Sequence, residues 1–98
     1  MKAELLIDRR DPVSADAFVE LVLWRVSQPV RASAHHYKYR LAYVVSGVCV
    51  LRFDNEAGKG DHKHVGNVEF PIVFSDPDQL VADFKAEITR WNHENRHS

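Results

Sequence analysis

One stretch of the sequence concentrates the residue types that most often carry chemistry. It runs from residue 53 to residue 64, FDNEAGKGDHKH, and passes from an apolar segment through two glycines to two histidines. His62 and His64 are two residues apart, so in an extended backbone their side chains point to the same side. The other polar groups of this stretch that could join them are Asp54, Asn55, Lys59 and Asp61.

Three interpretations of this stretch compete. In the first it is the solvated tip of a hairpin, as charge-rich loops usually are. In the second the two histidines and Asp61 or Asp54 bind zinc or manganese, although two histidines alone are a weak signal. The third is metal-free cleavage of a phosphodiester. One histidine would take the proton of a ribose 2′-hydroxyl, the other would protonate the leaving 5′-oxygen, and Lys59 would stabilise the negative charge of the transition state.

The segment that precedes this stretch favours the third interpretation. Residues 31–64 hold six of the 13 lysines and arginines but only three of the 14 acidic residues. Lys38 and Arg40 could bind phosphate, and Tyr39 is an aromatic residue of the kind that stacks on unpaired bases. The structural alternatives are a tyrosine face that packs against a helix and charges that guard an exposed strand. We expect Arg52 to pair with a nearby acid or to extend from an apolar face.

Composition limits the classes of protein that this chain can form. Its 98 residues are 45% hydrophobic and 28% charged, which indicates one soluble globular domain covering residues 1–98. The net charge of −1 does not indicate a strongly basic nucleic-acid binder. No apolar run approaches the ~20 residues of a membrane span, and the apolar start is too short for a signal peptide. The single cysteine, Cys49, agrees with a reducing compartment, so we expect a cytoplasmic protein.

The order of the expected elements indicates an α+β domain. Strands are predicted over residues 3–10, 17–26, 36–45 and 48–55, and Asp11-Pro12 is expected to end the first. Residues 62–74 are either a short strand or an extended segment interrupted at Gly66-Asn67. A helix follows from about Pro77, with Asp76 as its N-cap. We therefore predict an antiparallel sheet of about four to five strands with one C-terminal helix packed on it.

Two local patterns make this prediction specific. Ser46-Gly47 separates two β-rich runs and is typical of a tight hairpin turn, which would pair Val45 with Val48 and Arg40 with Phe53. Cys49, in the return strand, is expected to be a small core residue. In the helix, the apolar residues that recur on one face and would cover the sheet are Leu80, Phe84, Ile88 and Trp91.

Three segments resemble a known family. They are residues 37–44 (YKYRLAYV), 52–56 (RFDNE) and 58–64 (GKGDHKH). Together they are similar to the TumE family, small bacterial and archaeal proteins regarded as toxins of type II toxin–antitoxin pairs and encoded beside a helix-turn-helix antitoxin. Phe53 stands where a tyrosine is common in that family. The resemblance spans most of the chain and implies a toxin with a helix-turn-helix antitoxin as its partner. For toxins of this size, RNA cleavage is the usual expectation.

We therefore expect a toxin that cleaves RNA without a metal ion or other cofactor. His62 and His64 would be the acid–base pair, Lys59 would stabilise the phosphate, and Asp61 or Asp54 would orient a histidine. The residues expected to hold the substrate are Lys38, Tyr39, Arg40 and Asn55. The alternative is a non-catalytic module that binds a partner protein through its sheet edge or helix. The sequence leaves open which RNA is cut and whether the protein forms a homodimer.

Overall fold

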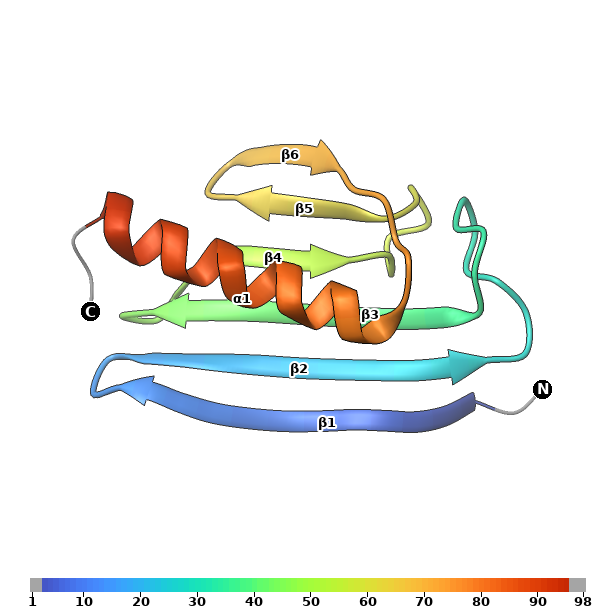
Figure 1. The fold of residues 1–98 in the computed structure, drawn as a ribbon, viewed down its shortest axis with the longest axis horizontal. Coiled ribbons are helices and arrows are strands. Elements are labelled where there is room, and N and C mark those ends of the chain that lie inside the picture. Colours follow the sequence, from blue (N-terminus) through green and yellow to red (C-terminus); the bar gives the residue numbers. More distant parts are fainter. Residues whose placement is uncertain (1–2, 96–98) are drawn as a thin grey trace.

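The chain folds as a six-stranded antiparallel sheet with one helix packed on it, an α+β architecture (Figure 1). The computed structural model describes residues 3–95. Each strand pairs with the next along the chain, in the order β1-β2-β3-β4-β5-β6. The elements are β1 (Ala3–Ser14), β2 (Ala17–Val26), β3 (Tyr37–Val45), β4 (Val48–Asp54), β5 (His62–Val65), β6 (Val68–Pro71) and α1 (Pro77–Glu94).

The sheet has more strands than the four to five predicted, because residues 62–71 form a second hairpin. β5 and β6 pair around Gly66-Asn67, and Gly66 has a φ of +60° that glycine adopts without strain. β1 is also longer than predicted and continues through Pro12 to Ser14. Proline is tolerated there because β1 is an edge strand, so the missing N–H removes no bond to a further strand.

The predicted hairpin between β3 and β4 is present, but its register differs from the prediction. Ser46 and Gly47 have φ values of +51° and +78°, as a tight turn of this type requires, and Val45 pairs with Val48. A β-bulge after Cys49 then shifts the pairing by one residue, so that Arg40 faces Asp54 instead of Phe53. Cys49 precedes the bulge and is exposed, so its assignment to the core was wrong.

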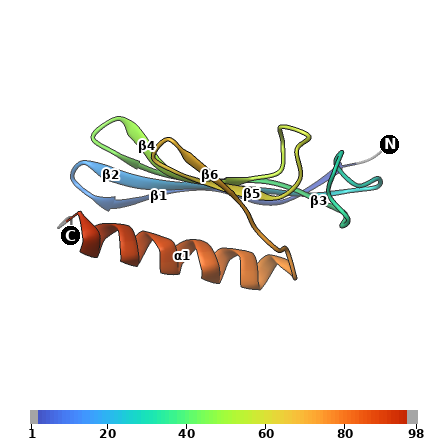
Figure 2. The same cartoon turned by 90° about the horizontal axis from the view of Figure 1, so that it is seen from above.

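The helix covers one face of the sheet (Figure 2). It begins as predicted, with the Asp76 carboxylate accepting a hydrogen bond from the Gln79 N–H at 2.8 Å and Pro77 in the first turn. Leu80 and Phe84 are buried, and Ile88 and Trp91 pack against the same core. The strand residues that meet them include Leu21, Leu23, Tyr39, Leu41, Tyr43, Leu51 and Phe53.

Candidate active site

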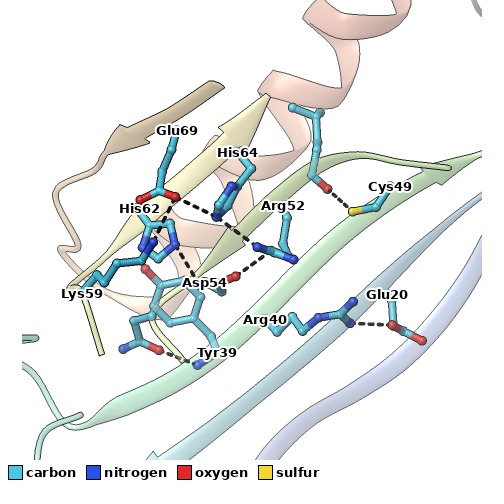
Figure 3. A network of polar contacts seen from close by, with 12 residues as sticks. Glu20, Tyr39, Arg40, Cys49, Arg52, Asp54, Lys59, His62, His64 and Glu69 are labelled. Carbon is cyan, nitrogen blue, oxygen red and sulfur yellow. Dashed lines mark hydrogen bonds and ion pairs between the residues drawn. The ribbon is translucent and has the colours of Figure 1, made fainter. Parts of the chain in front are cut away.

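The two predicted histidines lie on the face of the sheet that the helix does not cover, which we call the open face. Lys63, between them, pairs in register with Phe53, whose ring packs edge-on against Phe84 of α1. Side chains alternate along a strand, so His62 and His64 point the other way. Their register partners on β4 are Asp54 and Arg52, which share this face. Figure 3 shows the four side chains together, with the helix behind the sheet.

His62 is held by contacts to both of its ring nitrogens. Its Nδ1 lies 3.0 Å from the Gly60 carbonyl oxygen, and its Nε2 lies 3.2 Å from Asp54 Oδ1. A carbonyl oxygen only accepts, so Nδ1 carries a hydrogen. Gly60 has a φ of +90°, and a Cβ there would lie 3.1 Å from the Ala32 carbonyl oxygen. Glycine is therefore required at the turn that presents this carbonyl to His62.

Arg52 connects the carboxylate to the second histidine. Its Nε lies 2.7 Å from Asp54 Oδ2, and its Nη2 lies 3.0 Å from His64 Nε2. A guanidinium only donates, so His64 Nε2 accepts and the hydrogen of the neutral ring is on Nδ1. Burial, followed by the positive charge of Arg52, lowers the pKa of His64 from its ordinary value. The two imidazole rings are 4.8 Å apart between centroids.

Lys59 and Glu69 form the outer part of this cluster. Lys59 Nζ donates to Glu69 Oε2 at 3.3 Å, and the same oxygen lies 3.6 Å from His64 Nε2. Burial alone would raise the pKa of Glu69, but the hydrogen bond and charge of Lys59 outweigh it, so the pKa is lowered. Glu69 is therefore an anion at neutral pH, and it contacts two groups that were predicted to act on a phosphate.

Two further cations lie on the open face along β3. Arg40 faces Asp54 in register, and its Nη1 donates to Glu20 Oε1 at 2.8 Å. Lys38 is exposed and, being two residues from Arg40, points to the same side. Both predicted phosphate-binding residues thus share the face of the histidines, although Arg40 already has a carboxylate partner.

Three of the predicted residues belong instead to a separate buried network at the end of β3. Asp61 Oδ1 accepts hydrogen bonds of 2.8 Å from the Tyr39 hydroxyl and from His35 Nε2. Asn55 Oδ1 accepts from the Tyr39 N–H at 3.0 Å, and its Nδ2 donates to the Tyr37 carbonyl oxygen at 2.8 Å. Burial, followed by the bond to Asp61, raises the pKa of Tyr39.

This network separates the two aspartates that the sequence offered as partners of a histidine. Asp54 contacts His62, whereas Asp61 contacts His35. The ring of Tyr39 is fully buried beside Phe74, and Asn55 is fully buried as well, so neither side chain is open to a ligand in this structure. Asp61, Asn55 and Tyr39 support the loop that leads into β5, where the histidines lie.

Two members of the cluster, Arg52 and Glu69, were not predicted from the sequence to take part in it. Arg52 was expected to pair with a nearby acid, and its contact with Asp54 confirms that, but its bond to His64 was not expected. The available signal was its position two residues before Asp54, which places both on one face. Glu69 gave no such signal, because it joins the cluster only through the β5–β6 hairpin, where it pairs with His64.

Comparison with known proteins identifies the family. The family model described as toxin TumE matches residues 2–92. The chain belongs to the TumE toxin family. No curated protein and no solved structure matches it. The segments that carry the resemblance to TumE lie inside the matched range, and they contribute β3, the end of β4 and the loop leading into β5. Within residues 3–95, no helix combines the length and the apolar character needed to cross a bilayer.

The cluster in this TumE chain offers two kinds of chemistry. Histidines beside cationic side chains can transfer protons at a phosphodiester and stabilise its charge. Asp54, His62 and His64 also each offer one donor atom within 4.8 Å of the others, which is the spacing of a set that could hold a metal ion.

Proposed function

We propose that this chain is the toxin of a type II toxin–antitoxin pair and that it cleaves RNA in the cytoplasm without a metal ion. Membership of the TumE family supports the first part. It also supports an antitoxin partner, for which the resemblance implies a helix-turn-helix protein. One observation carries the second part: His62, His64, Arg52 and Lys59 converge on the open face of the sheet, opposite α1.

The reaction is attack by a ribose 2′-hydroxyl on the adjacent phosphorus. The bond from the 2′-oxygen to phosphorus forms and the bond from phosphorus to the 5′-oxygen breaks, which leaves a 2′,3′-cyclic phosphate and a 5′-hydroxyl. His64, a neutral ring and the more accessible of the two histidines, takes the 2′-hydroxyl proton on Nε2 after Arg52 moves from that nitrogen to the phosphate. His62, protonated on Nε2 beside Asp54, gives a proton to the leaving 5′-oxygen. No water is consumed.

The positive charges act on the phosphate. Lys59 and Arg52 stabilise the negative charge that grows on the equatorial oxygens in the transition state. Lys38 and Arg40 hold neighbouring phosphates along the strand and contribute to affinity instead of to the chemical step. Tyr39, Asn55 and Asp61 act indirectly, by fixing the loop that carries Lys59 and leads into β5 at His62.

Access to His62 requires a local change, because only 5% of its side chain is exposed. The Lys59–Glu69 ion pair beside it is exposed, and exposed pairs contribute little to stability, so a phosphate can displace the carboxylate at little cost. Lys59 then exchanges Glu69 for the substrate, which brings its charge to the reacting group.

The direct test is cleavage of a single-stranded RNA and of its all-deoxy counterpart by the purified chain. We expect the RNA alone to be cut, with 2′,3′-cyclic phosphate ends, because DNA lacks the nucleophile. His64→Ala should lower the rate by ~10²–10⁴-fold, the usual share of general acid–base catalysis. His36→Ala removes an exposed histidine from outside the cluster and should leave the rate unchanged.

Two results would refute this mechanism. One is equal cleavage of RNA and DNA, and the other is full activity in a His64→Ala variant whose circular dichroism spectrum matches the wild type. Growth after induced expression belongs in the same experiment. Growth arrest that persists in His64→Ala would favour the alternative, a toxin that acts by binding a partner protein without catalysis.

A further inference from the structure

The contact between Asp54 and His62 is incomplete as a hydrogen bond. Asp54 Oδ1 and His62 Nε2 are 3.2 Å apart, and both side chains are more than nine-tenths buried. Among residues 3–95, however, neither atom has a hydrogen-bond partner of acceptable geometry. Two buried polar atoms that face each other without a bond are costly, and a cation that contacts both of them would remove that cost.

The position of the hydrogen on the His62 ring indicates which kinds of cation could contact both atoms. Because Nδ1 donates to the Gly60 carbonyl oxygen, the neutral ring directs the lone pair of Nε2 towards the carboxylate. A lone pair and a carboxylate oxygen repel each other unless a cation lies between them. That cation is either a second proton on His62 or a metal ion. A histidine that donates its other N–H to a backbone carbonyl is the usual arrangement of a metal ligand.

The distances suit a small transition-metal ion. Bonds of 2.0–2.2 Å to nitrogen and oxygen place neighbouring ligand atoms of a tetrahedral zinc site roughly 3.3 Å apart. Asp54 Oδ1 and His62 Nε2 already have about this separation, at 3.2 Å. The donor atom of His64 lies within 4.8 Å of the other two and so needs to approach by at most about 1.5 Å. Its side chain is 22% exposed and is therefore not locked in the core.

Arg52 currently holds the place of a cation in this cluster. Its guanidinium contacts both Asp54 and the Nε2 of His64. The side chain of Arg52 is 37% exposed, so it can swing into solvent when a metal ion takes over those contacts. Arg52 thus already supplies positive charge to a carboxylate and a histidine nitrogen. A divalent ion would interact with the same two groups more strongly.

We propose that Asp54, His62 and His64 bind one divalent transition-metal ion of the zinc type, in exchange for Arg52. Two imidazole nitrogens and one carboxylate oxygen are ligands that zinc accepts, with a fourth position left for water. Binding of this ion does not depend on the proposed function. Its consequence does: the ion occupies the nitrogens that would otherwise carry protons, so it inhibits RNA cleavage.

The binding test uses the tag-free, metal-free chain titrated with Co²⁺, whose visible spectrum reports tetrahedral coordination, followed by displacement with Zn²⁺. We expect one ion per chain. His64→Ala and Asp54→Asn should each weaken binding by about 100-fold or more through loss of a ligand. His36→Ala, which removes an exposed histidine, should bind as the wild type does. Arg52→Gln should bind more tightly, because the competing cation is gone.

Two results would overturn the metal site, and one would overturn the exchange with Arg52. No saturable Co²⁺ binding by the folded wild type, or equal binding by folded His64→Ala, overturns the site. Two substitutions at different ligands keep the test valid if one of them unfolds the chain. Unchanged or weaker binding in Arg52→Gln overturns the exchange with that side chain.

An activity measurement separates this site from the proposed function. If both hold, stoichiometric Zn²⁺ inhibits RNA cleavage and a chelator restores it. If a chelator abolishes cleavage, the metal site stands and the metal-free mechanism fails. If the chain binds no metal but cuts RNA in the presence of chelator, the mechanism stands and the metal site fails.

Discussion

Asp54 and His62 lie directly opposite each other on β4 and β5, with Asp54 Oδ1 3.2 Å from His62 Nε2. Asp61 is next to His62 in the sequence but bonds to His35 and Tyr39 instead. Neighbouring residues in extended backbone point to opposite sides, so pairing between strands, not closeness in sequence, selects the carboxylate that meets the histidine. The two aspartates therefore have different tasks, and substitutions can distinguish them.

Asn55 provides the first prediction, which concerns stability. Its amide is fully buried and makes hydrogen bonds to the backbone on both sides of Lys38, at the Tyr37 carbonyl oxygen and the Tyr39 N–H. Asn55→Ala should lower the free energy of unfolding by about 1–3 kcal/mol, because the Tyr39 N–H and the Tyr37 carbonyl oxygen lose a partner. Urea denaturation measures this. Asn67→Ala, in the exposed β5–β6 turn, is the control and should cost less.

The same variant decides whether Asn55 binds substrate. Below its unfolding transition, Asn55→Ala should bind a non-cleavable RNA analogue with nearly the wild-type affinity. A large loss of RNA affinity without loss of stability would instead restore the role in substrate binding that the sequence suggested.

Tyr39 provides a prediction about alkaline pH. Its pKa in the folded chain is raised above the ordinary value of 10.0, so the hydroxyl stays protonated while the tyrosine of the unfolded chain ionises. The stability contributed by this hydroxyl is therefore complete below pH 10 and is lost as the pH rises above it. Tyr39→Phe should be less stable than the wild type at pH 8. The difference should shrink by about 1.4 kcal/mol for each pH unit above 10.

Denaturation of both proteins at pH 8 and pH 11 tests this. Phenylalanine fills the same place in the core but cannot donate to Asp61, so the comparison isolates the hydroxyl. A stability difference that stays constant between the two pH values would contradict the proposed protonated, buried hydroxyl.

Local patterns made much of the fold predictable. The turn at Ser46-Gly47 and the cap at Asp76 each depend on a few adjacent residues whose backbone preferences agree with the final structure. The apolar stripe of α1 is likewise a property of one segment. The bulge after Cys49 is different, because no residue there requires it and it depends on how β3 and β4 fit together. The predicted register failed at this point.

The candidate site was predictable only in part, for the same reason. Spacing alone placed His62 and His64 on one face, which the structure confirms. The shift of one residue at the bulge brings Arg40 opposite Asp54, and the β5–β6 hairpin brings Glu69 opposite His64. Contacts of this kind follow from the register of strands. The sequence therefore suggested which residue types would act but not which of them would meet.

Glu69 provides the last prediction, which concerns affinity for RNA. Its carboxylate contacts Lys59 and lies near His64, where the proposed function requires a phosphate. The pKa of Glu69 is lowered, so this negative charge is present at neutral pH and opposes the substrate. Glu69→Gln keeps the shape and removes the charge. Because the carboxylate would lie close to the phosphate, RNA affinity should rise by about fivefold when its charge is removed.

The matched control is Glu56→Gln, which makes the same change of charge at an exposed position on the loop before β5. Both variants should gain some affinity from the less negative chain, but Glu69→Gln should gain several-fold more at low salt. The difference should narrow as salt is raised, because ions screen exposed charges. Binding of a strand that lacks the reactive 2′-hydroxyl measures affinity without cleavage. An equal gain in the two variants would mean that RNA does not displace Glu69, and the phosphate would then have to bind away from Lys59.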